Sequence, residues 1–390
     1  MSAYHFKAQA LTPIHIGSGN EIDPLEFILE GNRLVRFNPA DVVNGLSGEE
    51  LRRYSQLVER ADLKGIQAFL RTHLDAAHHD HVYVDVSKEF KRLFEEKASN
   101  PSNQFRVDMM PHNPHSGAVY LPGSSIKGAI RTAVINYFAN IEPATKSTVH
   151  QTVGAEQNLR NKARILEESA LDRRHSQTER DVLRLLDVQD VDLPNDATRI
   201  DRALNYNPQK QGSQEIQIWV ERVKALADGG GAPQFEVTLH LDTAAMKHPG
   251  MKATLGRTLD FDTILRACNL FYWGRMTAEG EKFDQKKSGG KSWKALHELF
   301  PKGKTPDGQI VAIDPSKNYW CYPQRKRMLL RVGRFSHFES LSVDGLREGY
   351  NIQARTPIED MGATRTRCSM ENGRPAMPFG WLILTLERTL

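Results

Sequence analysis

The stretch LPGSSIKGAIRTA occupies residues 121–133 and carries the strongest structural signal in this chain. A Pro-Gly turn leads into two serines, after which apolar residues recur at helical spacing. These apolar residues are Ile126, Ile130, Ala133, Val134 and Phe138. The spacing predicts an amphipathic helix over about residues 125–140. Ser124 or Ser125 is expected to cap it, because a side-chain hydroxyl accepts a hydrogen bond from an otherwise unpaired N–H group at the helix start.

The first turns of this helix carry two cations, Lys127 and Arg131, which are four residues apart and therefore lie on one helix face. Unpaired N–H groups, the positive end of the helix dipole and two cations together make a site suited to phosphate. A nucleotide-binding P-loop is excluded, since Gly128 is followed by Ala129 rather than by Lys and Ser or Thr. The local sequence fits equally well a capped surface helix with two solvated cations.

Three further motifs stand near the two ends of the chain. They are LTPIHIGSG at residues 11–19, LRVGRF at 330–335 and PFGWL at 378–382. In this order, and together with the motif at 121–133, they resemble the RAMP superfamily of CRISPR RNA-binding proteins. Within that superfamily the chain is most similar to the large subunit that caps the crRNA 3′ end in type III-A (Csm) effector complexes. The stretch around Gly333 departs from the family pattern, which usually carries more glycines there.

The predicted elements favour an α+β protein with antiparallel sheets, because strands and helices are mixed and their connections are irregular. The resemblance to RAMP proteins implies two ferredoxin-like, RRM-related domains with helical insertions. A chain of 390 residues is long enough for two such cores. We expect an N-terminal domain over 1–200 with a helical insertion and a C-terminal domain over 201–390 with a basic insertion. The boundary is expected between residues 193 and 212.

Hydrophobic periodicity places the main elements along the chain. The expected strands are 4–10, 182–191, 234–241, 328–332 and 381–386, with a hairpin formed by 25–29 and 33–37. The expected helices are 48–74 with a break near Gly65, 151–180, 214–227 and 261–276.

Positive charge is concentrated in one segment rather than spread over the chain. The net charge is +4, whereas residues 282–334 contain 13 Lys or Arg against 4 Asp or Glu. A polyanionic partner would select such a segment. Phe335, His337 and Phe338 follow it, and side chains of this kind stack on the bases of single-stranded RNA. Trp381 begins an apolar strand and is expected in the core.

The resemblance implies a non-catalytic subunit that binds crRNA through phosphates and 2′-hydroxyls, caps its 3′ end, and aids crRNA 3′ maturation and complex assembly. The implied partners are crRNA, target RNA by proximity, the RAMP backbone subunit, the small helical subunit and host trimming nucleases. The residues expected to contact RNA are His15, Gly17, Ser18, Gly19, Gly123, Ser124, Ser125, Lys127, Gly128, Arg131, Arg331, Gly333, Arg334, Phe335 and His337. Glycine would let main-chain N–H groups approach RNA closely. No cofactor is expected.

The sequence leaves two other functions open. A RAMP endoribonuclease that processes the crRNA precursor would use His15 in general acid–base catalysis, although a lone imidazole more often has a positioning role. The second alternative is the equivalent terminal RAMP subunit of a type III-B (Cmr) complex.

Two clusters of potential metal ligands give weak indications. The first contains His73, His78, His79, Asp80, His81 and Asp85. Metal-dependent phosphohydrolases draw their ligands from separated helices, whereas these residues are close in sequence, so a surface loop is the better interpretation. The second, Asp187, Asp190 and Asp192, could attract Mg²⁺ but is a common surface pattern. We therefore expect no metal site.

The remaining composition points to an ordinary intracellular protein. Cys268, Cys321 and Cys368 form no CxxC pair, which favours a reducing compartment and argues against structural zinc. We expect no transmembrane helix and no signal peptide, and hence a cytoplasmic location without membrane contact.

Overall fold

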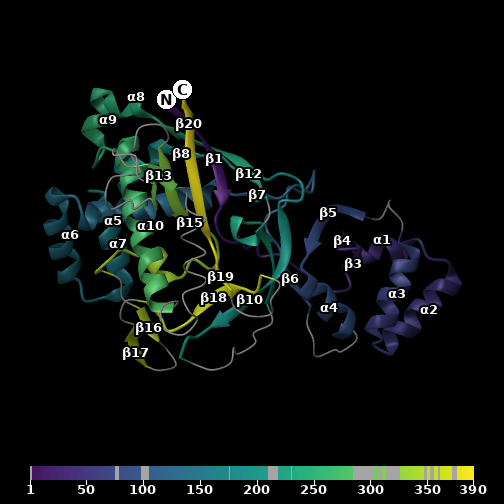
Figure 1. Ribbon diagram of the computed structural model, residues 1–390. Coiled ribbons are helices and arrows are strands. Elements are labelled where there is room, and N and C mark those ends of the chain that lie inside the picture. Colours follow the sequence, from purple (N-terminus) through teal and green to yellow (C-terminus); the bar gives the residue numbers. More distant parts are fainter. Residues whose placement is uncertain are drawn as a thin grey trace.

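Two large β-sheets with helices packed around them form the main part of the computed structural model (Figure 1). The structure describes residues 2–74, 79–97, 105–174, 176–209, 218–229, 231–283, 302–304, 310–312, 326–346, 349–351, 355–358, 361–370 and 376–390. The first and last described residues lie side by side, because Ala3 and Leu390 exchange two main-chain hydrogen bonds of 2.9 Å.

The first sheet is antiparallel and contains strands from both ends of the chain. Its order is β15 (Arg327–Arg331), β20 (Trp381–Thr389), β1 (Ser2–Ala10), β12 (Gln234–Leu241) and β8 (Leu186–Val188). Along the chain, helix α5 (Gly123–Asn140) lies between β1 and β8, and α10 (Phe261–Phe283) follows β12. The order β20-β1-β12-β8 with these two crossovers is that of a ferredoxin-like βαββαβ unit.

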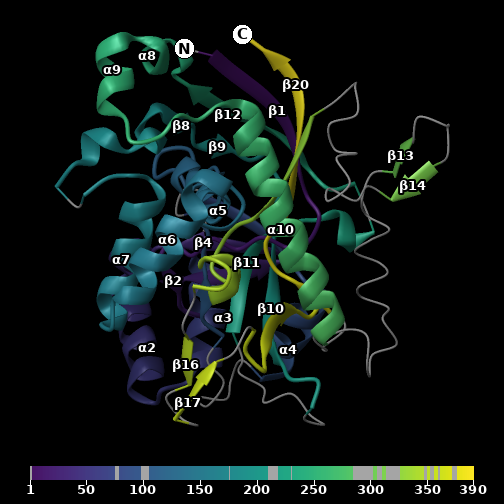
Figure 2. The same ribbon diagram turned by 90° about the vertical axis from the view of Figure 1, so that its left-hand side faces the viewer.

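Helices α5 and α10 pack on the apolar face of this sheet. β1 alternates buried Phe6, Ala8 and Ala10 with more exposed residues, so one of its faces meets the helices. The Tyr272 hydroxyl of α10 donates a hydrogen bond of 2.9 Å to the Ala129 carbonyl of α5. Figure 2 shows α6 (Pro143–Ala155) and α7 (Leu159–Ala170) on the outer side of α5 and α8 (Thr243–Lys247) and α9 (Pro249–Thr254) near the termini.

The second sheet is mixed and lies beside the first (Figure 1). Its order is β2 (Glu21–Ile22), β6 (Val107–Asp108), β11 (Ile218–Val223), β10 (Thr198–Tyr206), β5 (His79–Val86), β4 (Arg33–Phe37) and β3 (Phe27–Glu30), with β18 (Arg365–Cys368) on β10 and β19 (Met377–Pro378) on β18. The β10–β5 and β11–β6 pairings are parallel. Helix α4 (Lys88–Lys97) packs on one face, and α1 (Pro39–Asn44), α2 (Gly48–Glu59) and α3 (Leu63–His73) pack on the other face of β3 and β4.

Short elements complete the described chain. Three two-stranded pairs are β7 (Tyr120–Leu121) with β9 (Val191–Asp192), β13 (Lys302–Lys304) with β14 (Ile310–Ala312), and β16 (Gly349–Asn351) with β17 (Thr356–Ile358). The 3-10 turns are η2 (Thr178–Arg180), η3 (Val182–Leu185), η4 (Leu226–Asp228) and η7 (Phe338–Ser340). None of the helices within the described ranges is both long and apolar enough to cross a membrane.

Most strongly periodic predictions are confirmed, including the α+β class with antiparallel sheets. The expected strands 4–10, 234–241, 328–332 and 381–386 correspond to β1, β12, β15 and β20, and the expected helix 261–276 is the first part of α10. The hairpin is β3–β4. Trp381 is fully buried, as expected.

The predicted helix at 214–227 is wrong in its described part. Residues 218–223 form β11, which pairs along its whole length with β10. In the structure Glu221 and Arg222 are both buried and paired inside the protein, so charge did not mark solvent exposure there. Similarly, the expected helix 48–74 breaks at residues 60–62, where Asp62 caps α3, and Gly65 lies inside α3.

The sheets do not follow the predicted division into 1–200 and 201–390. β1 from the first range pairs with β12 and β20 from the second, and β10 spans residue 200. A ferredoxin-like order requires this, because its first strand lies between its third and fourth. A second ferredoxin-like domain stays a prediction.

The predicted serine cap of α5 is wrong, and glycine is required at its first residue. The helix begins at Gly123 after Pro122, without a side-chain cap, and the Gly123 N–H donates to Asp190 Oδ1 at 2.7 Å. A Cβ atom at Gly123 would lie 2.0 Å from the Val188 carbonyl oxygen of β8. Only glycine therefore lets α5 begin directly against this strand.

Gly123→Ala should lower the free energy of unfolding by about 1–3 kcal/mol, because α5 must shift to accommodate the added carbon. Gly128→Ala is the matched control on the same helix, since a Cβ atom there meets nothing within 4 Å. That control should be neutral or stabilising by up to about 1 kcal/mol. Urea unfolding followed by circular dichroism measures both. Equal stabilities of the two variants would contradict the close approach of α5 to β8.

Candidate functional site

A cavity of about 710 Å³ lies where three of the sequence motifs meet. We call it the glycine-loop cavity. Its walls come from the loop after β1, the start of α5 and the loop after β15. The predicted contact residues in its lining are Gly17, Gly19, Ser125, Gly128, Arg331, Gly333 and Arg334. Motifs separated by more than a hundred residues in sequence are therefore neighbours in space.

The loop after β1 is held between the two sheets by main-chain hydrogen bonds. Ile14 forms an isolated bridge with Val223 of β11, and Gly380 N–H donates to the Pro13 carbonyl at 2.8 Å. Ser18 donates to the Met109 carbonyl from both its main-chain N–H and its hydroxyl, at 3.1 and 2.8 Å. Ser18 thus fixes the loop rather than lining the cavity.

His15 is buried and takes part in the hydrogen bonds that hold the loop after β1. It is 1% exposed, and its Nδ1 lies 2.7 Å from the Glu221 carbonyl oxygen. A carbonyl oxygen only accepts, so Nδ1 carries the proton and donates this hydrogen bond. Burial lowers the pKa of His15, which keeps the ring neutral. The predicted direct contact of His15 with RNA is wrong for this conformation, because surrounding residues cover the side chain.

Gly333 allows the loop after β15 to touch the loop after β1. Its φ is +94°, and a Cβ atom there would lie 2.4 Å from the His15 carbonyl oxygen. The next residue, Arg334, donates its main-chain N–H to that same carbonyl at 2.9 Å. A side chain at position 333 would push the two loops apart, because L-residues rarely adopt this backbone conformation and the space is occupied.

The Arg334 side chain supplies positive charge at the cavity surface. It is 49% exposed, forms an ion pair with Asp108 of β6, and has its guanidinium 5.6 Å from the Phe335 ring centroid. Phe335 itself is half-buried, with ring centroids 5.7 Å from His15 and 4.8 Å from Phe379. It packs within the protein and positions the loop.

The two helix cations differ in what they can contact. Lys127 is half-buried on α5 and does not belong to the cavity lining. Arg131 is held by two carboxylates, with its Nη2 at 2.6 Å from Glu167 and 2.8 Å from Asp181. Burial opposes its charge, but these hydrogen bonds and ion pairs outweigh it and raise the pKa of Arg131. Its predicted role as a phosphate contact is wrong for this conformation, since its charge is already compensated.

At the helix start, Ser124 is exposed and Ser125 is half-buried. Asp190 already accepts the Gly123 N–H, so part of the expected anion site is filled by a side chain of the protein.

Arg331 belongs to a buried ionic cluster beneath the cavity. Its guanidinium is fully buried and lies 2.6 Å from Glu279 of α10, while Arg365 of β18 lies 2.8 Å from Glu339. Arg331 also lies over the Trp381 ring at 4.9 Å from its centroid. This cluster connects the first sheet, α10 and the second sheet, and the predicted RNA contact of the Arg331 guanidinium is wrong because no solvent reaches it.

His337 lies beside this cluster instead of facing RNA. Burial, followed by the positive charges of Arg331, Arg365 and Arg367, lowers the pKa of His337 to about 2. Its Nε2 accepts the Thr366 N–H at 3.3 Å. The ring is therefore neutral over the physiological range and acts as an acceptor.

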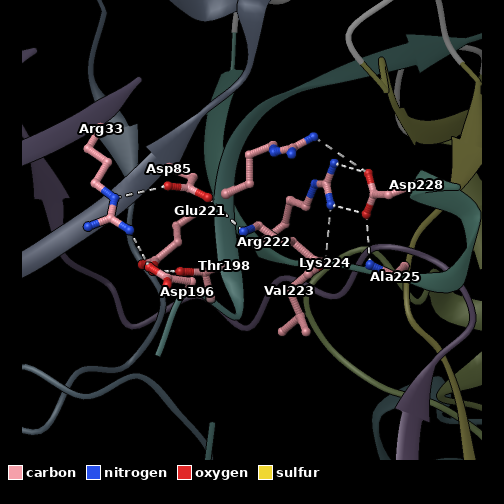
Figure 3. A network of polar contacts seen from close by, with 11 residues as sticks. Arg33, Asp85, Asp196, Thr198, Glu221, Arg222, Val223, Lys224, Ala225 and Asp228 are labelled. Atoms are coloured by element: carbon pink, nitrogen blue, oxygen red, sulfur yellow. Dashed lines mark hydrogen bonds and ion pairs between the residues drawn. The ribbon is translucent and has the colours of Figure 1, made fainter. Parts of the chain in front are cut away.

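A second polar network lies around β11, and Figure 3 shows the part of it that contains Thr198, Glu221, Arg222 and Asp228. Glu221 Oε2 accepts from His112 Nε2 at 2.7 Å and from the Met110 N–H at 3.0 Å, and Oε1 accepts from Thr198 at 2.7 Å. Burial opposes protonation of His112, but Glu221 outweighs it and raises the pKa of His112. Arg222 is held by Asp201 at 2.8 Å and by Asp228 at 2.6 Å.

The sequence analysis identified neither the residues of this network nor several of the residues that line the glycine-loop cavity. Adjacent opposite charges within an apolar segment, IWVERV at 218–223, were the available signal for the second network. The missed lining residues include Asn20, Asp108, Met109, Thr132 and Ser336. Asp108 carries no local signal, because its importance comes from lying opposite Arg334, which is far away in sequence.

The two groups of potential metal ligands named in the sequence analysis, for which no metal site is expected, lie only partly within the described residues, and the side chains of residues 75–81 are outside them. Among the described residues, no group of three or more His, Cys, Asp or Glu side chains could hold a metal ion. His73 pairs with Glu50, and Asp85 pairs with Arg33 and Lys224. His78 lies outside the described residues, as do Cys321 and most of the basic stretch between 284 and 325. Cys268 and Cys368 are buried free thiols, and burial raises the pKa of each.

Comparison with known proteins gives a consistent result. A model of the RAMP superfamily matches residues 7–219. A CRISPR system protein, Csm5 of Enterococcus italicus, is 29% identical over 165 residues, an alignment that spans 34% of this chain and 42% of the relative's length.

Two solved structures share the fold. A chain of a Csm–crRNA–target RNA ternary complex from a type III-A CRISPR-Cas system superposes with a TM-score of 0.64 at 18% identity, covering 98% of this chain and 100% of that one. Csm5 of T. onnurineus superposes with a TM-score of 0.57 at 18% identity, covering 97% and 99%.

His337→Asn should make the protein less sensitive to acid. The native state holds His337 neutral while the unfolded chain binds a proton below its ordinary pKa of 6.5, so stability is complete above that pH and falls as the pH is lowered. Asn keeps a side-chain acceptor for the Thr366 N–H. Between pH 6 and 5 the wild type should lose up to about 1.4 kcal/mol more than the variant. Parallel urea unfolding across this range is the test, and identical pH slopes would contradict it.

Proposed function

Because this chain is a member of the RAMP superfamily, we propose that it is the RNA-binding subunit that caps the crRNA 3′ end in a type III-A (Csm) effector complex. The observation that carries the proposal is the convergence of both glycine loops and α5 on one cavity. The similarity to Csm5 and to a chain of a Csm–crRNA–target RNA complex supports the type III-A assignment over a type III-B one.

The glycine-loop cavity has the properties needed to hold an RNA backbone. Gly17, Gly19 and Gly333 line the cavity without side chains of their own, which would let phosphate and sugar oxygens approach their main chain. Arg334 adds one exposed cation, and the hydroxyls of Ser125 and Thr132 add partners for 2′-hydroxyl groups. Such contacts position RNA and give little base readout. Weak sequence preference suits a subunit that must accept many spacers.

A binding role is better supported than ribonuclease activity. The candidate base, His15, is covered by protein, and its Nδ1 proton is committed to the Glu221 carbonyl. A general base must lie within hydrogen-bond reach of the proton it takes. In this arrangement His15 positions the loop after β1, and the proposal is that the chain does not itself cut RNA.

The proposed partners follow from the same role. They are crRNA, target RNA by proximity, the RAMP backbone subunit, the small helical subunit and host nucleases that trim the crRNA 3′ end, all within the cytoplasm. The remaining contacts we propose for RNA come from Ser124 and Lys127, which lie on the first turns of α5 beside the cavity.

Substitutions of Arg334 and of Asp108, which form an ion pair, should change the affinity for RNA in opposite directions. Arg334→Ala removes the exposed cation and leaves Asp108 uncompensated, so the affinity for labelled single-stranded RNA should fall about tenfold. Asp108→Asn removes the opposing charge and should raise the affinity. The slope of log K against log salt should decrease by about 0.7 in Arg334→Ala, the value for one phosphate contact on a single strand.

Fluorescence anisotropy at several salt concentrations measures these changes. Lys247→Ala, an exposed cation on α8 outside the cavity, is the control and should bind as the wild type. If Arg334→Ala and Lys247→Ala behave alike, the glycine-loop cavity is not the RNA site.

Removing this chain from the assembled complex should alter the crRNA 3′ end more than target cleavage. A terminal capping subunit defines where trimming stops, whereas cutting is expected from another subunit. Sequencing of bound crRNAs should therefore find longer 3′ ends, and a matched target RNA should still be cut. Normal 3′ ends combined with complete loss of cutting would exclude the proposed position in the complex.

A further inference from the structure

A second cavity, of about 340 Å³, opens between α5, α7 and the segment that follows η7. We call it the α5–α7 pocket. Figure 2 shows α7 beside α5, and the ion pair between Arg131 of α5 and Glu167 of α7 joins the two helices at the pocket.

The α5–α7 pocket adjoins the glycine-loop cavity. Both are lined by Thr132 of α5 and by Leu341. Gly128 lies one turn before Thr132 and lines the cavity, whereas Ile135 lies about one turn after it and lines the pocket. A strand of RNA held in the glycine-loop cavity would therefore pass the mouth of the pocket.

The wall that follows η7 is fixed to α5 by hydrogen bonds. The Asp344 N–H donates to Asn136 Oδ1 at 2.9 Å, and Asn140 Nδ2 donates to the Asp344 carbonyl at 3.0 Å. Ser342 Oγ donates to the Phe338 carbonyl at 2.7 Å, which holds the turn between these two residues. The pocket is therefore formed before a ligand arrives, as is usual for small-molecule sites.

The inner walls of the pocket are apolar. Ile135 and Val343 belong to the main core cluster, and Leu166 and Leu346 pack against it while partly exposed. Phe338, one of the aromatic residues that follow the basic segment, is half-buried and adds a ring to the lining. Apolar walls with an aromatic ring suit a flat, uncharged group.

The polar groups of the pocket suit a neutral partner with donors and acceptors. Glu167 and Asp181 both bind Nη2 of Arg131, at 2.6 and 2.8 Å, and compensate its charge. A guanidinium carries five N–H donors, so Arg131 can also donate to an uncharged oxygen or ring nitrogen. Glu167 and Lys162 lie on the α7 wall, where they offer an acceptor and a donor. The edge of a nucleobase has the matching groups.

We propose that the α5–α7 pocket receives one nucleobase of the RNA whose sugar-phosphate backbone lies in the glycine-loop cavity. The base would stack on Phe338 between the apolar walls, with Arg131 and Glu167 at its polar edge. Leu341, 66% exposed at the border of the two cavities, would cover the base and its ribose. Every base has a stacking face, so such a site tolerates different sequences. This inference rests on the function proposed above.

Two other occupants fit the pocket less well. A phosphate would meet the Glu167 carboxylate, and like charges repel at this distance. An apolar side chain of a partner protein would cover the polar atoms of Arg131 and Glu167 without replacing their hydrogen bonds to water, which costs free energy.

RNA with and without bases tests the inference with the full chain. A short fluorescein-labelled oligouridine is compared with a chain of the same length and label that is made of abasic ribose phosphates. The wild type should bind the oligouridine about tenfold more tightly, because base stacking adds to the backbone contacts. Equal affinities of the wild type for the two chains would overturn the inference.

Variants place the base contact in the α5–α7 pocket. Ala163→Trp adds a large ring to the lining from an exposed position of α7. It should remove the preference for oligouridine and leave the affinity for the abasic chain unchanged. Ala244→Trp, at an exposed position of α8 outside both linings, is the matched control and should keep the preference.

Phe338→Ala should lower the affinity for oligouridine about tenfold through the loss of stacking. Its affinity for the abasic chain should equal that of the wild type, and this comparison separates a lost base contact from a damaged fold. An equal loss for both chains in Phe338→Ala or in Ala163→Trp would contradict a base site.

The results also separate this inference from the proposed function. If Arg334→Ala weakens the binding of both chains while Ala163→Trp changes neither, RNA binds in the glycine-loop cavity and the pocket holds no base. A preference for oligouridine that survives Ala163→Trp would assign the base contact to another site, and the pocket to an occupant such as a partner's apolar side chain. If neither chain binds, the proposed function and this inference fail together.

Discussion

The position of β1 constrains everything else in this protein. It is hydrogen-bonded along its length to β12 on one side and to β20 on the other, so the first strand of the chain is an interior strand of the first sheet. The loop that leaves β1 therefore begins beside the loop that enters β20. Gly333 and Gly380, which lie in the same C-terminal region, then contact that loop through the His15 carbonyl and the Pro13 carbonyl. The glycine-loop cavity is a consequence of this strand order.

Burial, rather than sequence position, decides what each charged residue does. Arg331 and Arg334 are three residues apart, yet Arg331 is enclosed with Glu279 while Arg334 faces the cavity. Removing one partner of a buried pair costs about 3–5 kcal/mol because the other charge is left uncompensated in a poorly solvated place. The ionic clusters around Arg331 and Arg222 therefore fix how the two sheets meet, and they leave few cations for an RNA partner.

For the proposed function, the chemistry of the glycine-loop cavity suits an RNA backbone. The glycine-loop cavity presents main-chain N–H groups, hydroxyls and one exposed cation, which match phosphate and sugar.

The sequence by itself determined the strongly periodic elements and the glycine motifs that meet at the cavity. β1, β12, β20 and α10 follow from apolar spacing, and the glycine motifs at 17–19 and 333 do lie at one site. It could not separate exposed from buried cations: Lys127, Arg131, Arg331 and Arg334 look alike in the chain. Only the tertiary structure supplies the carboxylates of Glu167 and Asp181 for Arg131, Glu279 for Arg331 and Asp108 for Arg334, from segments remote in sequence. Hydrophobic periodicity depends on neighbours along the chain, whereas charge compensation depends on neighbours in space. For this reason only the tertiary structure shows that residues 218–223 form strand β11 and that Glu221 and Arg222 are buried in it.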